Sequence, residues 1–353
     1  MKKSISFLFF GTPHRPVGGF KVAFEYANHL TSCGYDVHLV YSMTLNPGQT
    51  SLKDLMRYAR RKVFRISARS WFNLAPSISE HTVLTLRQRD VPRTDFYVAT
   101  AMQTSRFLKD FDVPDDHKLY LIQGFENWGV SDQEVFDTYR YGLKNIAISK
   151  WLKAKVEQTG ANCTLIRNGF DFDYFRLTNP IDTRSPFTIS MLFHNDSRKG
   201  CGYGIEALTM VKAKYPQLKA LFFGFPERPA DLPEWIEYNH CPDRETHNRI
   251  YNTSSIYLAP SLQEGWGLTV GEAMICGNAI VCTDTLGFQE MVTEGKEGFI
   301  VPTRNSLALA DAIMELIENP GLRIRMARTS VETISRFSWD ESFNKLECLL
   351  NSQ

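Results

Sequence analysis

The stretch Ser261-Leu262-Gln263-Glu264-Gly265-Trp266-Gly267-Leu268-Thr269-Val270-Gly271-Glu272-Ala273-Met274 carries the clearest indication of fold and site. It follows a short apolar run at 256–259 that predicts a buried strand, and its own apolar residues predict a helix over 270–276. The loop is therefore expected at the carboxyl end of a strand in a parallel sheet, where open α/β folds bind their ligands.

The glycines and the predicted helix start favour a ligand that carries phosphate groups. Gly265 and Gly267 let the backbone approach a ligand closely. The backbone amides of Gly267, Leu268 and Thr269 can hold a diphosphate, because a helix N-terminus attracts anions.

Two glutamates in the same stretch suit a sugar ligand. Glu264 on the loop and Glu272 on the helix can accept hydrogen bonds from sugar hydroxyls. Glu272 has a second interpretation, because Thr269-x-x-Glu272 also fits a capping box that needs no ligand.

A second cluster, Asp196-Ser197-Arg198-Lys199-Gly200, lies between a predicted strand at 187–193 and a predicted helix at 204–214. Arg198 and Lys199 can neutralise a leaving diphosphate, and the nearby His194 is a plausible phosphate contact. An exposed polar turn is the alternative interpretation. Asp171-Phe172-Asp173 imitates a metal-binding motif but lies in a segment rich in turn formers, so no metal is expected.

The remainder of the chain alternates between strand and helix patterns, which predicts parallel sheets. We expect an α/β protein with two doubly wound, Rossmann-like domains that face a central cleft. The expected boundaries are 1–170 for the N-terminal domain, 171–336 for the C-terminal domain and 337–353 for a final helix. The predicted strands are 5–10, 37–41, 96–99, 119–122, 145–148, 163–166, 187–193, 218–223, 256–259, 279–282 and 298–301, with a further helix over 307–318.

The N-terminal half offers weaker candidates. Gly18-Gly19 precedes a predicted helix, where a ligand's phosphates or an acceptor can approach. No G-x-G-x-x-G motif is present, so NAD binding is not expected. Glu126 can orient or deprotonate an acceptor hydroxyl and Trp128 can stack on a sugar, although both are equally compatible with structural loop roles.

Length, charge distribution and cysteine content limit the kind of protein that this chain can be. The chain has 353 residues, 43% of them hydrophobic, which suffices for two cores. Residues 1–170 hold 23 Lys and Arg against 15 Asp and Glu, or +8, whereas the rest holds 17 against 24, or −7. The seven cysteines show no C-x-x-C spacing, which predicts reduced and mostly buried thiols in a cytoplasmic protein.

Membrane and nucleic-acid partners depend on two segments. The apolar run at 5–10 is read as a first strand rather than a signal peptide, and no run reaches the roughly 20 apolar residues of a membrane span. The pattern of residues 52–72 predicts a basic amphipathic helix. Such a helix either lies on the inner face of an anionic membrane or packs its apolar stripe on its own domain. Nucleic acid is not expected, because stacking aromatics are not interleaved with the basic residues.

The chain resembles the family 4 retaining glycosyltransferases of the GT-B fold. The resemblance covers about residues 140–305 and is thinner before them, where Gly18-Gly19, 123–126 and 149–152 resemble the rhamnosyltransferase-like branch. Its motifs are Arg167-Asn168-Gly169-Phe170-Asp171, Arg198-Lys199-Gly200, Pro260-Ser261, the run from Glu264 to Glu272, 277–281, 287–290 and 295–298.

The resemblance implies a role for each matching position. Glu272 would hold the ribose and Glu264 would contact the donor sugar. Arg198 and Lys199 would bind the diphosphate, which Gly18-Gly19 would approach from the other domain. The loop 240–243, including Cys241, would pass the base, and a helix over 338–350 would cross back to the N-terminal domain. The chain departs from many members in having His194 in place of an arginine and Gln123 in place of a histidine.

The expected function is that of a metal-independent, retaining hexosyl- or deoxyhexosyltransferase. It would transfer a sugar from a nucleoside diphosphate donor to a hydroxyl of a glycan or lipid-linked glycan in cell-surface polysaccharide synthesis, with Glu264 and Glu126 as the catalytic carboxylates. No cofactor besides the nucleotide sugar is expected. Two alternatives stay open: a non-catalytic nucleotide-sugar-binding subunit, and a GT-B epimerase that acts on the nucleotide sugar itself.

Overall fold

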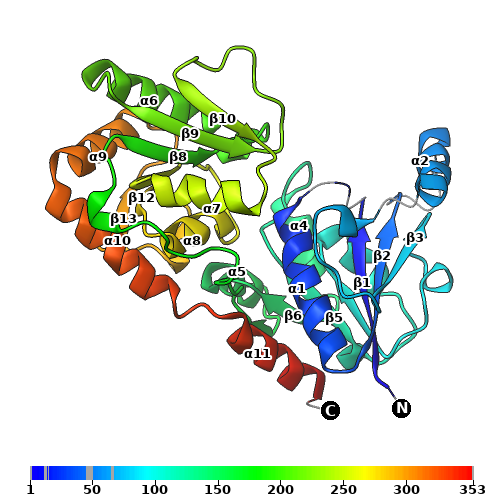
Figure 1. Ribbon diagram of the computed structural model, residues 1–353. Coiled ribbons are helices and arrows are strands. Elements are labelled where there is room, and N and C mark those ends of the chain that lie inside the picture. Colours follow the sequence, from blue (N-terminus) through cyan, green and yellow to red (C-terminus); the bar gives the residue numbers. More distant parts are fainter. Residues whose placement is uncertain (1, 12–13, 15, 45–50, 65–66, 352–353) are drawn as a thin grey trace. The chain divides into compact units, whose positions relative to one another are not determined.

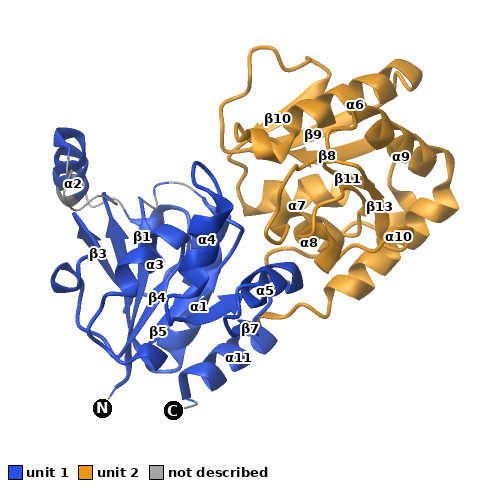
Figure 2. Ribbon diagram, turned by 180° about the vertical axis from the view of Figure 1, so that it is seen from behind, with its two compact units in different colours: residues 1–168, 340–353 blue, residues 169–339 orange. Residues whose placement is uncertain are grey.

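The computed structural model describes residues 2–11, 14, 16–44, 51–64 and 67–351. The chain divides into two compact units (Figure 2). Unit 1 comprises Met1–Asn168 with Asp340–Gln353, and unit 2 comprises Gly169–Trp339. Each unit is built on one parallel sheet.

Unit 1 contains a seven-stranded sheet in the order β3-β2-β1-β4-β5-β6-β7, and every pairing is parallel. The predicted strands are confirmed with small shifts at their ends. Strand β3 was not predicted, because its sequence Ser79-Glu80-His81-Thr82-Val83 is mostly polar, as an edge strand tolerates. The strands are β1 (Ser4–Phe10), β2 (Asp36–Ser42), β3 (Ser79–Val83), β4 (Phe96–Ala99), β5 (Lys118–Ile122), β6 (Lys144–Ala147) and β7 (Cys163–Leu165).

The helices of unit 1 include both an early and the last element of the chain. They are α1 (Gly18–Ser32), α2 (Leu52–Phe64), α3 (Met102–Leu108), α4 (Asp132–Tyr139), α5 (Lys150–Glu157) and α11 (Trp339–Asn351). Helix α11 returns to unit 1 (Figures 1 and 2), where Ser342 donates a hydrogen bond to the carbonyl of Arg167 and Leu346 and Leu350 are buried. The predicted return of the C-terminal helix is thus confirmed.

Unit 2 contains a six-stranded sheet in the order β10-β9-β8-β11-β12-β13, again parallel throughout. The edge strand β10 was not predicted, because Ile236-Glu237-Tyr238-Asn239-His240 is largely polar. The elements are β8 (Thr188–Leu192), β9 (Lys219–Gly224), β10 (Ile236–His240), β11 (Ile256–Ala259), β12 (Ala279–Thr283), β13 (Gly298–Val301), α6 (Cys201–Lys214), α7 (Arg244–Thr253), α8 (Leu268–Ile275), α9 (Ser306–Glu318) and α10 (Pro320–Ile334).

The turn-rich segment after residue 168 is fastened to unit 2. The buried Arg184 guanidinium donates to the carbonyls of Ser254 at 3.0 Å and Gly277 at 3.1 Å. The amide of Thr178 donates to Asn252 Oδ1 at 2.7 Å. These contacts hold the turn-rich segment against the body of unit 2.

The basic segment 52–72 is not one continuous helix. Helix α2 ends at Phe64, residues 65–66 lie outside the described part, and Ala68–Ser70 form a short 3-10 turn. Arg69, expected on a solvated face, instead donates to the carbonyls of Leu74 and Ile78 at 2.8 Å each. Among the described residues, no helix is both long enough and apolar enough to cross a membrane.

The cysteines differ from the expectation of mostly buried thiols. All seven are free, but only Cys201, Cys276 and Cys282 are buried, and Cys33, Cys241 and Cys348 are exposed. Two of the exposed thiols belong to helices that pack together in unit 1: Cys33 directly follows α1 and Cys348 lies on α11. The sequence pattern did not reveal the exposure of these thiols, because exposure depends on tertiary packing and not only on the neighbouring residues in the chain.

Candidate active site

The parallel sheet of unit 2 brings three candidate loops to one edge. Strands β10, β9, β8 and β11 run side by side in that order (Figure 2), with Leu192 paired to Phe223, and Gly224 paired to His240, at their carboxyl ends. The loops that leave this edge carry Arg198 and Lys199 after β8, Cys241 after β10 and Glu264 after β11. The site predicted from separate motifs therefore shares one sheet edge within unit 2.

The loops after β8 and β11 are joined through their backbones. The amide of Leu262 donates to the carbonyl of Arg198 at 2.6 Å. Gly200 has a φ of 62°, and a Cβ added there would lie 2.0 Å from the carbonyl oxygen of Pro260. Only glycine permits this approach, so the glycine of the Arg198-Lys199-Gly200 motif locks the two loops together.

The joined loops place two predicted site residues in direct contact. Lys199 Nζ lies 2.7 Å from Glu264 Oε1, and Ser261 Oγ donates to the same oxygen at 2.8 Å. The lysine side chain is 30% exposed and the glutamate side chain 13% exposed. A charged pair with a partly accessible ammonium group suits an anionic ligand, because the ammonium has three donors and the carboxylate uses only one of them.

Arg198 and His194 have partners that the sequence did not predict. Arg198 Nε donates to both carboxylate oxygens of Asp196, at 2.9 and 3.0 Å, and the Arg198 amide also donates to Asp196. These bonds lower the pKa of Asp196. His194 accepts a hydrogen bond from the Asp196 amide at Nδ1, at 2.9 Å. Asp196 therefore orients both predicted phosphate contacts.

The start of α8 decides between the two interpretations of Glu272. The helix begins at Leu268 with Gly267 as its N-cap, so Thr269 is its second residue and Glu272 its fifth. The capping-box interpretation of Thr269 and Glu272 is therefore wrong, and Glu272 does not lie in the first turn. Leu268 and Thr269 do occupy the first turn, where amides lack carbonyl partners within the helix.

Gly267 is required by the protein itself. Its φ is 109°, and a Cβ there would approach the ring of Phe288 to 2.7 Å. Gly287 packs equally closely on this loop, because a Cβ there would lie 2.5 Å from the carbonyl of Glu264. The loop backbone is thus confined by close packing before any ligand enters.

Glu272 is buried among tyrosines. It is 6% exposed, and the Tyr251 hydroxyl donates to its Oε2 at 3.4 Å. Burial first, and the Glu272 charge next, raise the pKa of Tyr174 to about 12. Burial likewise raises the pKa of Tyr251 well above its ordinary value, with the Glu272 charge contributing. The neutral Tyr251 hydroxyl is thus the donor to Glu272 Oε2.

Cys241 lies directly after β10 rather than inside a longer loop. His240 is the last residue of β10, so the loop begins only at Cys241 and is shorter than the predicted loop 240–243. Cys241 is exposed, has a φ of 45°, and donates its amide to the carbonyl of Gly224 at 2.8 Å. Asp243 then caps α7 by accepting from the amide of Thr246 at 2.8 Å.

The glycine pair of unit 1 lies at the N-terminus of α1. Gly18 and Gly19 are its first two residues, and Gln123 Nε2 donates to the carbonyl of Gly19 at 3.1 Å. A Cβ at Gly19 would lie 3.3 Å from Gln123 Nε2, so the second glycine leaves room for this contact. The sequence analysis singled out Gly19 and Gln123 separately and did not predict their contact.

Glu126 has a structural partner within unit 1. It is 7% exposed, and its Oε2 accepts from the amide of Met102, the first residue of α3, at 2.6 Å. A carboxylate at this position stabilises a helix N-terminus. Its catalytic role stays a prediction. Trp128, by contrast, is 49% exposed, as a sugar-stacking residue requires.

The Asp171-Phe172-Asp173 motif forms a local turn. Asp171 Oδ1 accepts from the amides of Asp173 at 3.0 Å and Tyr174 at 2.8 Å. These contacts agree with the structural interpretation of the motif. The expected absence of a metal requirement stays a prediction.

Comparison with known proteins supports a glycosyltransferase. Residues 187–319, from β8 to the end of α9, match the family model of the glycosyl transferases group 1. The fold matches that of HepE from Anabaena, solved in complex with UDP-glucose, with a TM-score of 0.73, 16% identity and coverage of 99% of this chain and 100% of that chain. The predicted GT-B fold is confirmed.

Two curated relatives are similar over shorter spans. The phosphatidyl-myo-inositol mannosyltransferase of Mycolicibacterium smegmatis is 26% identical over 208 residues, which are 56% of this chain and 54% of the relative. The D-inositol 3-phosphate glycosyltransferase of Corynebacterium urealyticum is 34% identical over 171 residues, 44% of this chain and 40% of the relative. The chain thus spans about half the length of these relatives, and the rhamnosyltransferase-like branch stays a prediction.

Proposed function

We propose that this protein is a retaining, metal-independent glycosyltransferase that moves a sugar from a nucleoside diphosphate donor to a hydroxyl of a glycan or lipid-linked glycan. The proposal rests mainly on one observation, the contact of Lys199 with Glu264 at the sheet edge beside the N-terminus of α8. A cation and helix-terminal amides there suit a diphosphate, and the carboxylate suits the sugar attached to it.

Each group has a distinct task in the proposed reaction. Lys199, Arg198 and the first amides of α8 stabilise the negative charge that develops on the leaving diphosphate. Glu264 accepts hydrogen bonds from the donor sugar and holds it for attack by the acceptor hydroxyl. Glu272, fixed by Tyr251, accepts hydrogen bonds from the ribose. Because these groups are held in place before binding, little reorganisation is needed in the transition state.

The named relatives guide the proposed substrates. HepE was solved with UDP-glucose, which supports a nucleoside diphosphate donor for a chain of the same fold. The two relatives, a phosphatidyl-myo-inositol mannosyltransferase and a D-inositol 3-phosphate glycosyltransferase, support a hexosyl donor and a lipid-linked or inositol-type acceptor. A deoxyhexosyl donor of the rhamnosyl type remains part of the proposal, as does a role in cell-surface polysaccharide synthesis in the cytoplasm.

The first experiment is a thermal unfolding series with UDP, GDP, dTDP and ADP, each with magnesium or with a chelator. A bound diphosphate raises the unfolding midpoint with saturation, so we expect a shift with one base and no dependence on magnesium. Glu272→Gln should weaken nucleotide affinity by about 10- to 100-fold, the value of a hydrogen bond to a charged group. Glu315→Gln, an exposed glutamate of α9, is the matched control.

Product analysis then separates the proposal from its two alternatives. Transfer of the sugar to an acceptor with release of the diphosphate supports the proposal. Binding without donor turnover would favour a non-catalytic subunit. A changed sugar that still carries the diphosphate, formed without acceptor, would favour an epimerase.

We further propose that α2 places the enzyme on an anionic membrane, where a lipid-linked acceptor resides. Arg61 is buried and lies 4.4 Å from the centre of the Tyr41 ring, which anchors the helix to unit 1. Apolar residues of the helix lie exposed: Leu52 by 75%, Leu55 by 45%, Met56 by 64% and Val63 by 74%. Lys53, Arg57 and Arg60 are exposed beside them. Such a helix fits a surface of acidic lipids.

Vesicle sedimentation tests this part of the proposal. The double variant Leu55→Glu with Met56→Glu should lose binding to phosphatidylglycerol vesicles at low salt, whereas Leu307→Glu, at a leucine of α9 that is 60% exposed, should bind like the unchanged chain. Binding should fall with added salt, because the lipid charge is screened. Equal binding of both variants, or none by the unchanged chain, would assign α2 to another surface role.

A further inference from the structure

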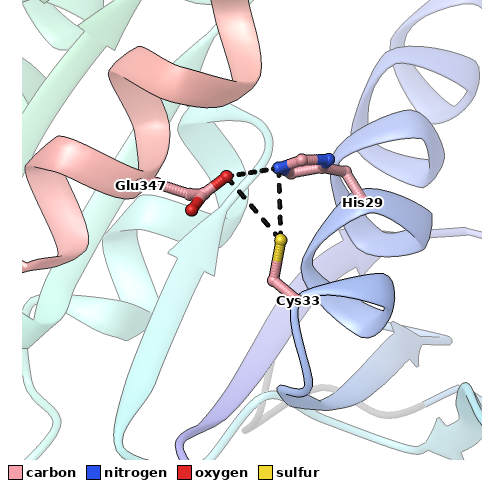
Figure 3. A group of neighbouring side chains, drawn as sticks. All are labelled: His29, Cys33 and Glu347. Atoms are coloured by element: carbon pink, nitrogen blue, oxygen red, sulfur yellow. Dashed lines mark hydrogen bonds and ion pairs between the residues drawn. The ribbon is translucent and has the colours of Figure 1, made fainter. Parts of the chain in front are cut away.

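A second group of chemically active side chains lies in unit 1, at the opposite end of α1 from Gly18 and Gly19. Among the described residues, His29, Cys33 and Glu347 form the one group of three whose potential metal-ligand atoms lie within 4.8 Å of one another. Figure 3 shows His29, in the last turn of α1, Cys33, directly after this helix, and Glu347, on α11, with all three side chains pointing toward one another. None of the three belongs to the proposed transferase site.

Two of the three distances between these atoms are close to those between the ligands of a small divalent ion. Cys33 Sγ lies 3.5 Å from His29 Nε2 and 3.7 Å from Glu347 Oε1. Tetrahedral zinc, with bonds of about 2.0–2.3 Å, places its ligand atoms about 3.3–3.6 Å apart. His29 Nε2 and Glu347 Oε1 are closer, at 2.6 Å, because they share a hydrogen bond that a metal ion would replace.

The helices hold these ligands in place. The His29 ring stacks on Phe343 with ring centres 4.0 Å apart and an angle of 8° between their planes. Phe343 lies one turn before Glu347, so one face of α11 both packs on the imidazole and presents the carboxylate to its Nε2. His29 and Cys33 are likewise one turn apart at the C-terminal end of α1, where the helix dipole favours a cation.

We propose that His29, Cys33 and Glu347 bind one zinc-type divalent ion that clamps α11 to α1. Thiolate, imidazole and carboxylate together suit zinc, and the exposure of Cys33 leaves a fourth position for water. Binding requires the Cys33 thiolate, so the thiol proton passes to solvent. The imidazole binds through Nε2 and keeps its remaining proton on Nδ1.

The thiol proton gives the site a measurable signature. Zinc binds the thiolate form of cysteine, whereas an ordinary cysteine thiol is protonated at neutral pH. Zinc binding should therefore release about one proton per ion from Cys33. Calorimetric titration of the chelator-treated full chain in two buffers of different ionisation enthalpy measures this release.

Matched variants test the assignment. We expect one zinc ion per chain, a raised unfolding midpoint, and affinity lowered about 10-fold or more in Cys33→Ser and His29→Ala. Cys348→Ser removes the exposed thiol next to Glu347 and should change none of these.

Cobalt in place of zinc should give a thiolate charge-transfer band that Cys33→Ser abolishes. Zinc affinity unchanged in Cys33→Ser, or no binding to a folded unchanged chain, would overturn the proposal. The unfolding midpoint of each variant without metal reports whether it folds.

Discussion

Glu264 in unit 2 and Glu126 in unit 1 are a natural pair to compare, because both follow a strand of a parallel sheet and both were predicted to be catalytic. Glu264 contacts the ammonium of Lys199 and the hydroxyl of Ser261, in a loop next to a helix N-terminus. Glu126 is 7% exposed and accepts from the amide of Met102 at the start of α3. The same position relative to a strand thus serves two different ends.

The difference lies in what balances each negative charge. Glu264 is balanced by a partly exposed lysine, whose ammonium group is also open to an incoming diphosphate. Glu126 is balanced by a helix terminus that cannot move without unfolding the first turn of α3. Burial first, and the Glu126 charge after it, raise the pKa of Tyr120 well above its ordinary value, as expected of a carboxylate in a closed environment. A carboxylate that can change partners is the better candidate for chemistry.

The largest expected effect is on turnover at Glu264. Glu264→Ala should lower turnover by about 100-fold or more while the fold persists, because a preorganised contact to the reacting sugar is lost. Glu264→Gln keeps the shape and removes the charge that Lys199 balances, so it separates charge from packing. Steady-state kinetics with a circular dichroism control measures both. Turnover unchanged in Glu264→Ala would remove this residue from the site and would end the contrast with Glu126.

A smaller effect is expected at Glu126, and it should appear in stability rather than in chemistry. Glu126→Ala leaves the buried Met102 amide without this acceptor and should lower the free energy of unfolding by about 1–3 kcal/mol. Glu126→Gln retains an acceptor oxygen and should cost less. Denaturant unfolding gives the stability, and kcat of the folded fraction gives the chemistry. A folded Glu126→Gln variant with collapsed turnover would instead restore the catalytic role predicted from the sequence.

The smallest effect is expected at Asp196, which pairs with Arg198 near the surface. Its pKa is lowered in the folded protein, mainly by the bond from Arg198, so its contribution to stability is present above its ordinary pKa and is lost as the pH falls through the folded-state value. Asp196→Asn should reduce the free energy of unfolding at neutral pH by less than about 1 kcal/mol. Unfolding curves of the variant and the unchanged chain should differ at neutral pH and coincide at acidic pH.

The sequence was a good guide wherever the signal was local. Apolar runs such as 256–259 and 96–99 gave strands with the same bounds, since buried parallel strands need continuous apolar side chains. Edge strands β3 and β10 were missed, because one side of an edge strand tolerates polar residues. The end of α2 was misplaced, because Arg61 and Arg69 form contacts inside unit 1 that their charge alone did not predict.

By itself, the amino-acid sequence determined the two parallel α/β units, the loop from Ser261 to Glu272 and the residue types of the candidate site. These follow from periodicity and from the few residues that tight turns and helix starts accept. Tertiary structure alone decided that Lys199 contacts Glu264, that Glu126 caps α3, and that His29 and Cys33 meet Glu347. Such pairings join positions distant in the chain, and they depend on how strands order and helices pack rather than on any local pattern.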